Sequence, residues 1–503
     1  MNKLPLYFIA FALGVALSIA PNRAQADVEP DFFDEEFFEE EEEFFEEEDF
    51  EEFVEEEFEE VEYEEQISGC ILDTEARLGI LCDNWSTRII GRFGVDALFL
   101  GTDSASDGAF RPRSSGAGLS TARIGVSGTL YRDWVYKVEY DFVQERLDNI
   151  DVDEDSSRFM GESARGQITD AYIAYRGIED FTIRVGNMKA AYSLAMANDS
   201  RFDLFMENAT AMHVYGNSKP RYPGIAASYY DKQYKVLANV GVHLEPYNIE
   251  NGSEDGDDIS LYGRVSYTPY LRNEWYSHVG IGGTYVARNG DDAFQTYTSV
   301  APFTTAIARV GDDPLFVANR AASYESSYVV NLDLAGGWRQ YGGQLGLTRM
   351  THSPVGGGDS VNQHMFYVQG NWWLTEERNA YDPREGVFGR IVPIRRLGAG
   401  GMGAVGVSVR YHRLLLDDSG TGFVSSDGAP ATARFNEGGR LWGITAAVMW
   451  KPNPYVKFVG EYVHVERDAF ACGSVRGAGN PTAVACLGGD TPSGIQFRAL
   501  IDF

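Results

Sequence analysis

Apolar and polar residues alternate with a period of two along most of the chain. In the stretch 88–97, Phe93 and Val95 fall on one side, whereas Arg92 and Asp96 fall on the other. Successive side chains of a strand point to opposite faces, so this pattern predicts a strand with one apolar and one polar face. Similar runs bring the number of predicted strands to sixteen: 88–97, 119–131, 133–143, 166–176, 181–188, 221–230, 232–243, 257–268, 275–288, 326–337, 338–350, 361–374, 403–415, 439–451, 453–466 and 492–503.

Sixteen strands of about ten residues favour an all-β fold, a transmembrane antiparallel β-barrel. Beyond residue 26 no stretch reaches the roughly 18 apolar residues that a spanning helix needs, so strands must form any membrane span. Tight turns such as 131–133 alternate with long polar stretches, and we expect the long stretches to be outer loops. Those stretches are 289–325, 375–402 and 467–491. A soluble β-sandwich is the alternative, but it would not need sixteen strands in one uninterrupted array.

The two ends of the chain carry patterns typical of an exported barrel. Residues 1–26 contain a basic Lys3, an apolar run over 4–20 and the small-x-small sequence of residues 24–26, which predict a signal peptide; the alternative is a membrane anchor. The last residue is Phe503, and apolar residues stand at every second position before it. This ending resembles the C-terminal signal of outer-membrane barrels, so we expect the protein in the outer membrane of a Gram-negative bacterium.

An acidic extension precedes the predicted barrel. Of the 75 acidic residues in the chain, 25 lie in residues 1–66, where Phe residues interrupt runs of Glu. Such dense like charge opposes a compact core and predicts a solvated segment over 27–66. Apolar residues at spacings of three to four between Phe50 and Val61 also permit an amphipathic helix, and the acidic groups could bind cations or a cell-wall component. Residues 67–87 would then be a linker and residues 88–503 the barrel.

Four cysteines form two local pairs. In an exported protein this spacing favours two short-range disulfides over a metal site, because no His or carboxylate ligands flank the cysteines convincingly. The expected pairs are Cys70 with Cys82 and Cys472 with Cys486.

Strand parity also predicts which side chains line the water-filled lumen. If the apolar side of each strand faces lipid, the other side must face the channel. A recurring arginine falls on this inner side, and an always-protonated guanidinium favours anions over cations. The alternative is that these arginines pair across the wall with inward carboxylates such as Asp96, Glu139 and Asp141. The arginines are Arg92, Arg123, Arg184, Arg264, Arg410 and Arg498.

No catalytic constellation stands out in the sequence. The seven histidines are scattered, and the Gly-rich stretch 398–406 lacks the Lys-Ser/Thr of a phosphate-binding loop. We therefore predict neither an enzyme nor a cofactor or metal requirement. Outside the cytoplasm, a chain with a net charge of -33 is also not expected to bind nucleic acid.

Several segments resemble the phosphate-selective porin O and P family. They are Val185-Gly186-Asn187-Met188-Lys189, Ser200-Arg201, the 258–269 stretch (DISLYGRVSYTP), Leu374-Thr375-Glu376-Glu377, Val392-Pro393, Val409-Arg410-Tyr411 and Trp450-Lys451-Pro452-Asn453-Pro454. The resemblance implies a sixteen-stranded barrel, a homotrimer, and an inward-folded loop that narrows the pore in the 189–221 connection. It also implies that basic residues there bind phosphate or related anions, namely Lys189, Arg201, Lys219 and Arg221.

Two functions follow from these observations. The first is a porin for passive diffusion of phosphate or other small anions through the outer-membrane lipid. The second is a nonselective general porin or structural envelope protein whose acidic extension binds a periplasmic or cell-wall partner. Residues 67–503 contain seven Lys and 33 Arg, whereas the phosphate-selective members of the family are rich in lysine at the channel centre. The acidic extension is a second departure from the family pattern.

Overall fold

A computed structural model describes most of the predicted barrel and a short stretch before it. The described residues are 70–73, 79–101, 115–143, 167–208, 221–244, 259–272, 274–287, 298–299, 317–318, 324–354, 360–416, 440–467, 471–474, 484–487, 491 and 493–503. The predicted signal peptide and the acidic extension at 27–66 lie outside them. Among the described residues, no helix is both long enough and apolar enough to cross a membrane.

The chain divides into two compact units, Met1–Arg88 and Ile89–Phe503. In the described part of the first unit, β1 (Cys70–Asp73) pairs antiparallel with β2 (Gly79–Cys82). Strand β2 also pairs with the beginning of β3. Cys70 lies opposite Cys82 in this register, and Cys82 is disulfide-bonded.

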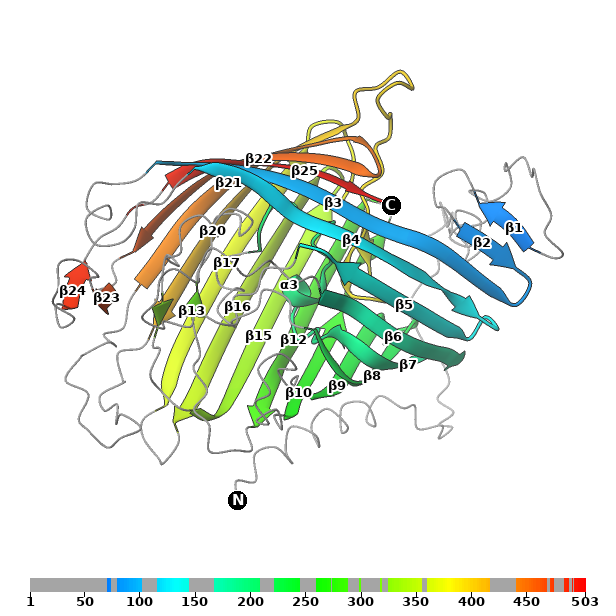
Figure 1. Cartoon of the computed structure of the whole chain (residues 1–503), viewed down its shortest axis with the longest axis horizontal. Coiled ribbons are helices and arrows are strands. Elements are labelled where there is room, and N and C mark those ends of the chain that lie inside the picture. The colour runs from blue at the N-terminus through cyan, green and yellow to red at the C-terminus, as the bar shows by residue number, and fades with distance from the viewer. Residues whose placement is uncertain are drawn as a thin grey trace, which may run out of the picture. The chain divides into compact units, whose positions relative to one another are not determined.

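The second unit is a closed antiparallel barrel of sixteen strands, in agreement with the predicted fold (Figure 1). The strands are β3 (Trp85–Gly101), β4 (Gly116–Leu130), β5 (Trp134–Asp141), β6 (Gln167–Ile178), β7 (Phe181–Lys189), β8 (Arg221–Asp231), β9 (Val236–Leu244), β10 (Ile259–Tyr267), β12 (Trp275–Ala287), β15 (Tyr324–Trp338), β16 (Tyr341–Pro354), β17 (Val361–Trp373), β20 (Ala404–Leu416), β21 (Arg440–Asn453), β22 (Val456–Arg467) and β25 (Ser493–Asp502). Each overlaps one predicted strand.

Short elements accompany the barrel strands. They are α3 (Leu194–Ala197), β11 (Leu271–Arg272), β13 (Thr298–Ser299), β14 (Val317–Ala318), β18 (Tyr381–Asp382), β19 (Val387–Phe388), β23 (Ala471–Ser474) and β24 (Val484–Leu487). Strands β23 and β24 pair so that Cys472 lies opposite Cys486, a register in which the predicted disulfide would join adjacent strands.

The last strand closes the barrel against the first. Strand β25 pairs antiparallel with β3, from Ser493 opposite Gly101 to Asp502 opposite Arg92. The terminal Phe503 exchanges two backbone hydrogen bonds with Gly91, at 3.0 and 3.1 Å. A Cβ at position 91 would lie only 2.3 Å from the Phe503 ring, so glycine makes room for the terminal aromatic residue.

The two ends of the barrel differ in their connections. Tight turns at 131–133, 179–180, 339–340 and 454–455 lie at one end, whereas longer connections leave the other end. The outer face carries apolar side chains, and near the tight turns four exposed aromatic rings stack in a row with centroids 5.4 to 6.1 Å apart. Such a row is typical of the aromatic girdle at a membrane interface. Its members are Trp275, Trp338, Tyr341 and Trp372.

The expectation that 375–402 forms an outer loop is wrong. The connection between β17 and β20 lies at the tight-turn end, where Trp373 donates to Gln340 O and Leu397 donates to Pro452 O at 2.8–2.9 Å. The period-two pattern does not distinguish a long turn from a long loop, and length alone suggested the wrong end.

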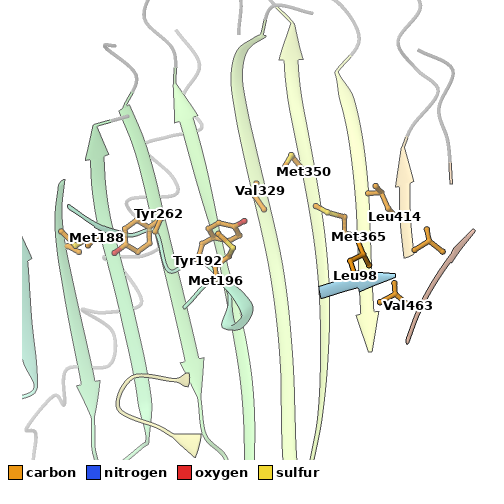
Figure 2. Close-up of a cluster of buried hydrophobic side chains, with 13 residues drawn as sticks. Leu98, Met188, Tyr192, Met196, Tyr262, Val329, Met350, Met365, Leu414 and Val463 are labelled. Atoms are coloured by element: carbon orange, nitrogen blue, oxygen red, sulfur yellow. The ribbon is translucent and has the colours of Figure 1, made fainter. Parts of the chain in front are cut away.

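Inside the barrel, an apolar cluster covers the inner wall toward the long connections (Figure 2). Its side chains come from strands around the wall and from the segment after β7. Members include Leu98, Met188, Tyr192, Met196, Tyr262, Val329, Met350, Met365, Leu414 and Val463. Through Tyr192 and Met196, the cluster packs the segment that follows β7 against the barrel wall.

Candidate functional site

The segment at 190–208, which follows β7, folds into the lumen. It begins with α3, whose N-cap Ser193 accepts a hydrogen bond from Met196 N at 3.2 Å. A serine at this position satisfies one of the free N–H groups of the first turn. Leu194 and Met196 are buried against the wall, and the short helix ends at Asn198. We call residues 190–208 the inward segment.

Two carboxylates of the wall anchor the inward segment through its backbone. Asp333 of β15 accepts from Leu194 N at 2.7 Å, and Glu461 of β22 accepts from Met206 N at 2.6 Å. Both carboxylates are almost completely buried. Hydrogen bonds to a charged partner are stronger than neutral ones, so these contacts fix the segment at two points of the barrel wall.

Cations of the wall hold the later part of the inward segment. Lys457 of β22 donates to Arg201 O at 2.9 Å and to Asp203 O at 3.3 Å. Arg410 of β20 donates to Glu207 O at 2.8 Å. The segment therefore spans the lumen between β7 and the opposite side of the barrel, which is the arrangement expected of a loop that narrows a pore.

A second segment enters the lumen from the tight-turn end, namely the β17–β20 connection at 374–403. Arg264 of β10 donates to Gly386 O at 2.7 Å, and the Tyr381 hydroxyl lies 2.6 Å from His278 Nδ1. Burial raises the pKa of Tyr381 to about 12. The second segment ends in a sharp turn at Gly403, where φ is +85° and a Cβ would lie 2.3 Å from Lys451 O.

The two segments meet inside the barrel. Phe388 N donates to Asn198 Oδ1 at 2.9 Å, which links the second segment to the end of α3. A cavity remains between the two segments and the barrel wall, and the polar part of its lining consists of amide, hydroxyl and charged side chains. Its lining includes Asn198, Asp203, Gln344, Tyr367, Gln369, Asn379, Phe388 and Arg410.

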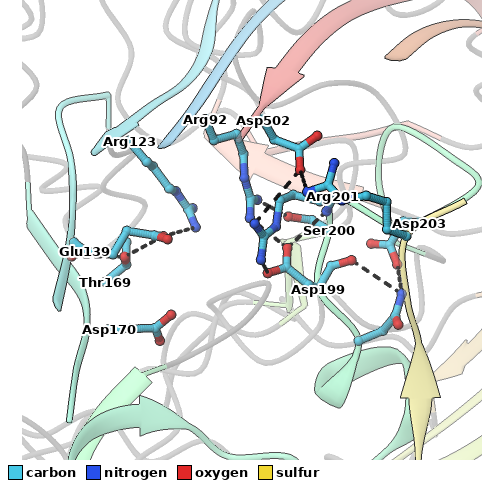
Figure 3. A network of polar contacts seen from close by, with 12 residues as sticks. Arg92, Arg123, Glu139, Thr169, Asp170, Asp199, Ser200, Arg201, Asp203 and Asp502 are labelled. Carbon is cyan, nitrogen blue, oxygen red and sulfur yellow. Dashed lines mark hydrogen bonds and ion pairs between the residues drawn. The ribbon is translucent and has the colours of Figure 1, made fainter. Parts of the chain in front are cut away.

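Arginines and carboxylates form a network on one side of this constriction (Figure 3). Asp199 of the inward segment pairs with Arg92 of β3 at 2.7 Å and with Arg201 at 3.0 Å. Arg201 also lies 3.9 Å from Asp502 of β25. Burial opposes ionisation of Asp199, but the charges of Arg92, Arg201 and Lys189 outweigh it and hold its pKa well below the usual range.

A second group of ion pairs lies along β4, β5 and β6. Arg123 pairs with Asp141 at 2.7 Å and with Glu139 at 3.2 Å. Asp170 pairs with Arg221 of β8 at 2.7 Å and with Lys137 at 2.5 Å. Arg123 and Arg221 face the lumen as predicted, whereas Lys137 was not among the predicted residues. Adjacent carboxylates compensate the charge of all three.

Arg498 has the same kind of environment on β25. Its guanidinium pairs with both oxygens of Asp96, at 2.7 and 2.8 Å, and with Glu207 of the inward segment at 2.8 Å. Five of the predicted lumen cations are thus paired with carboxylates: Arg92, Arg123, Arg201, Arg221 and Arg498.

Three other predicted arginines face the lumen with no carboxylate within ion-pair distance among the described residues. Arg184 lies 4.7 Å from the centre of the Tyr172 ring, and Arg410 lies 3.9 Å from that of Phe205. Arg264 is 2% exposed, and its Nε and Nη1 atoms have no hydrogen-bond partner. Lys189 donates to Asn198 O at 3.1 Å, and Lys219 lies outside the described residues.

Besides Lys137, the prediction missed two lumen lysines that lie inside predicted strands, on either side of a tight turn. Lys451 and Lys457 stand on either side of 454–455, and both are buried inside the barrel. Strand parity could have found them, since Met449 and Val459 share their inward faces. Neither lysine has an ion-pair partner in the described part of the chain.

The model of the family "phosphate-selective porin O and P" matches residues 102–471. The chain belongs to this porin family. Two relatives support the match: a Caulobacter vibrioides protein without an assigned function is 25% identical over 58% of this chain, and Porin O of Pseudomonas aeruginosa is 22% identical over 69% of it. The match covers 76% of Porin O but only 55%, about half, of the Caulobacter protein.

Two solved structures also match this chain. An anion-selective porin from Comamonas acidovorans matches with a TM-score of 0.47 and 13% identity, covering 83% of this chain and all of that one. OmpT of Vibrio cholerae, in its trimer form, matches with a TM-score of 0.47 and 10% identity, covering 84% of this chain and all of that one. The porin family and the closed barrel together identify a channel protein of the Gram-negative outer membrane.

Proposed function

We propose that this porin is a passive, anion-preferring channel for phosphate or other small anions. The observation that carries the proposal is a set of five lumen cations without a carboxylate within ion-pair distance in the described part of the chain. They are Arg184, Arg264, Arg410, Lys451 and Lys457.

The lumen carboxylates, in contrast, have donors close by. Asp96, Asp141 and Asp199 pair with arginines, whereas Asp333 and Glu461 accept backbone N–H groups of the inward segment. The negative charge of the first three is compensated by arginines, whereas an N–H group is neutral and does not cancel the charge of Asp333 or Glu461. The five cations outnumber these two carboxylates, and we infer an excess of positive potential along the path. Such a potential attracts anions, and conduction requires that each contact be weak enough for the anion to leave.

The proposal that phosphate is the solute rests on the description of the family and on the similarity to Porin O. Arg410 is the strongest candidate contact, because it lines the cavity between the two inward-folded segments. Its guanidinium already uses Nε for Gln369 and Nη1 for Glu207 O, which leaves Nη2 for a solute. Homotrimer assembly remains part of this proposal, and native mass spectrometry of the purified protein would test it.

The experiment is a titration of single-channel chloride conductance with phosphate. Phosphate should lower the conductance of the wild type, and Arg410→Gln should raise the half-blocking concentration about tenfold, the effect of one charge-assisted hydrogen bond. Arg132→Gln, at an exposed tight turn, is the matched control and should behave as wild type. If phosphate leaves the wild-type conductance unchanged, the phosphate proposal fails.

A general porin with weak selectivity is the second candidate. It is favoured by the pairing of Arg92, Arg123, Arg201, Arg221 and Arg498 with carboxylates, which cancels half of the predicted basic wall. A structural role for the extension at 27–66 would add to either function. Deleting that segment should leave ion selectivity intact if the barrel alone determines it.

A further inference from the structure

Four exposed basic side chains lie on the outer face of four consecutive strands, close to the long connections. They are Arg349 of β16, His364 of β17, Arg413 of β20 and Arg440 of β21, and we call them the outer basic arc. Parity places them outside the barrel, because each stands two residues from another outward side chain, such as Leu347 beside Arg349.

The strand register brings these four residues to neighbouring positions. Arg349 lies opposite His364. Arg440 lies opposite Leu415, which is two residues from Arg413 on the same face of β20. Arg413 lies opposite Phe366, two residues from His364. Neighbouring strands are about 4.8 Å apart, so the four side chains span roughly 15 Å along the rim.

A row of aromatic rings lies beside the arc, and two of its members, Phe366 and Trp442, lie opposite Arg413 in the register. Phe366 and Tyr411 have centroids 6.2 Å apart, Tyr411 and Trp442 stack at 6.2 Å, and Trp442 contacts His464 at 5.8 Å. Aromatic rows of this kind mark the boundary between hydrocarbon and headgroups.

The spacing along β21 places the arc at the outer boundary of the membrane. From Trp450, near the tight turns, to Arg440 the strand runs ten residues. At about 3.3 Å per residue and a tilt of about 40°, this is a height of roughly 25 Å, the height of the apolar band of an outer-membrane barrel. The arc therefore faces the headgroup layer on the side of the long connections.

The charge of the arc is largely uncompensated. Arg349 donates to Asn362 Oδ1 at 3.0 Å, whereas Arg413 and Arg440 have no ion-pair partner within the described ranges. Glu466 of β22, opposite Trp442, is the carboxylate nearest in register.

Within the described ranges, other strands carry apolar outward residues at the same level of the barrel. At the corresponding ends of β3, β5, β6, β9 and β10 the outward residues are apolar and exposed. These are Phe99, Phe142, Ile168, Leu244 and Ile259.

We propose that the outer basic arc binds the phosphate groups of a phosphorylated glycolipid, the lipid A type of molecule, in the outer leaflet. Guanidinium groups match phosphate geometry through paired hydrogen bonds, and clustered arginines at a membrane surface recognise anionic headgroups. The acyl chains would lie on the apolar outward residues below, such as Val409 and Ile444.

The test compares glycolipid binding by the folded protein in detergent, measured by native mass spectrometry. The probes are bisphosphorylated lipid A and the same lipid with both phosphates removed. The double variant Arg413→Gln/Arg440→Gln should bind bisphosphorylated lipid A about 30-fold more weakly than wild type, given the usual contribution of an arginine near anionic lipid. The control Arg132→Gln/Arg176→Gln, at exposed positions of the tight-turn end, should bind as wild type.

Single-channel conductance of the double variant should equal that of wild type, which separates loss of the site from loss of the fold. The proposal is overturned if the double variant binds bisphosphorylated lipid A as tightly as wild type, or if removal of the phosphates does not weaken binding to wild type. It is also overturned if inorganic phosphate at equal concentration displaces the glycolipid, since the site would then be one for free phosphate.

Discussion

Arg498 and Arg410 both face the lumen, but their partners differ. Arg498 is paired bidentately with Asp96 and also with Glu207, whereas Arg410 donates only to neutral oxygens. The charge of Arg498 is neutralised by these carboxylates, and its ion pairs join β25 to β3 and to the inward segment. The charge of Arg410 remains available to a solute in the channel. At the scale of single residues, the partner decides whether an arginine acts in stability or in selectivity.

Replacing these two residues should separate the two roles. Arg498→Gln leaves Asp96 buried without its counter-ion, and breaking a buried pair from one side costs about 3–5 kcal/mol. Arg410→Gln should cost less than Arg498→Gln, because it removes hydrogen bonds to neutral groups and the contact with the Phe205 ring but leaves no buried carboxylate without its counter-ion. Urea unfolding of both variants in the same lipid checks this. Equal losses of stability would contradict the distinction.

The pH dependence of stability provides a second test at this scale. Arg92 and Arg201 keep the pKa of Asp199 below its usual value of about 4, so its ionised form stabilises the folded state. That contribution is fully present above about pH 4 and is lost as the pH falls through the lower, folded-state pKa. The stability difference between wild type and Asp199→Asn should therefore persist down to about pH 4 in pH-dependent unfolding. Its disappearance already near pH 5 would show that Asp199 is not held ionised.

Strand parity predicted much of the site, but not the partners of its residues. The inward placement of Arg92, Arg264 and Arg410 follows from the alternation of their strands. Asp199 and Glu207, which neutralise two of the arginines, belong to the inward segment, where no period applies. Their positions depend on a path through the lumen that the local pattern does not determine.

At the scale of elements, the inward segment depends on anchors from strands far away in the chain. Asp333 and Glu461 are separated from their backbone partners by 139 and 255 residues. The segment has only one short helix of its own, so its position relies on these contacts. The family resemblance located this connection correctly, and the residues alone gave no sign of its anchors.

Removing an anchor should loosen the constriction. Asp333→Ala deprives Leu194 N of its acceptor, a hydrogen bond to a charged group worth about 1.5–3 kcal/mol. We expect larger current fluctuations and a higher mean conductance in single-channel recordings. Asp333→Asn retains an acceptor oxygen and is the matched variant, with a smaller effect. Steady current at the wild-type level in Asp333→Ala would mean that the anchor does not restrain the segment.

For the whole molecule, the period-two pattern was sufficient to predict the barrel. All sixteen predicted strands are present, because a wall between lipid and water imposes alternation on every strand. The β17–β20 connection was assigned to the wrong end, since its length resembles that of an outer loop. Its role inside the barrel comes from contacts with Arg264, His278 and Asn198, which no local pattern contains.

The central claim is that uncompensated cations give the whole channel an excess of positive potential. The most direct test is the reversal potential of the wild-type channel in a planar bilayer under a potassium chloride gradient. The account predicts a reversal potential displaced toward the chloride equilibrium potential, and a smaller displacement at high salt because screening weakens the field. A value of zero or one displaced toward the potassium equilibrium potential would contradict it.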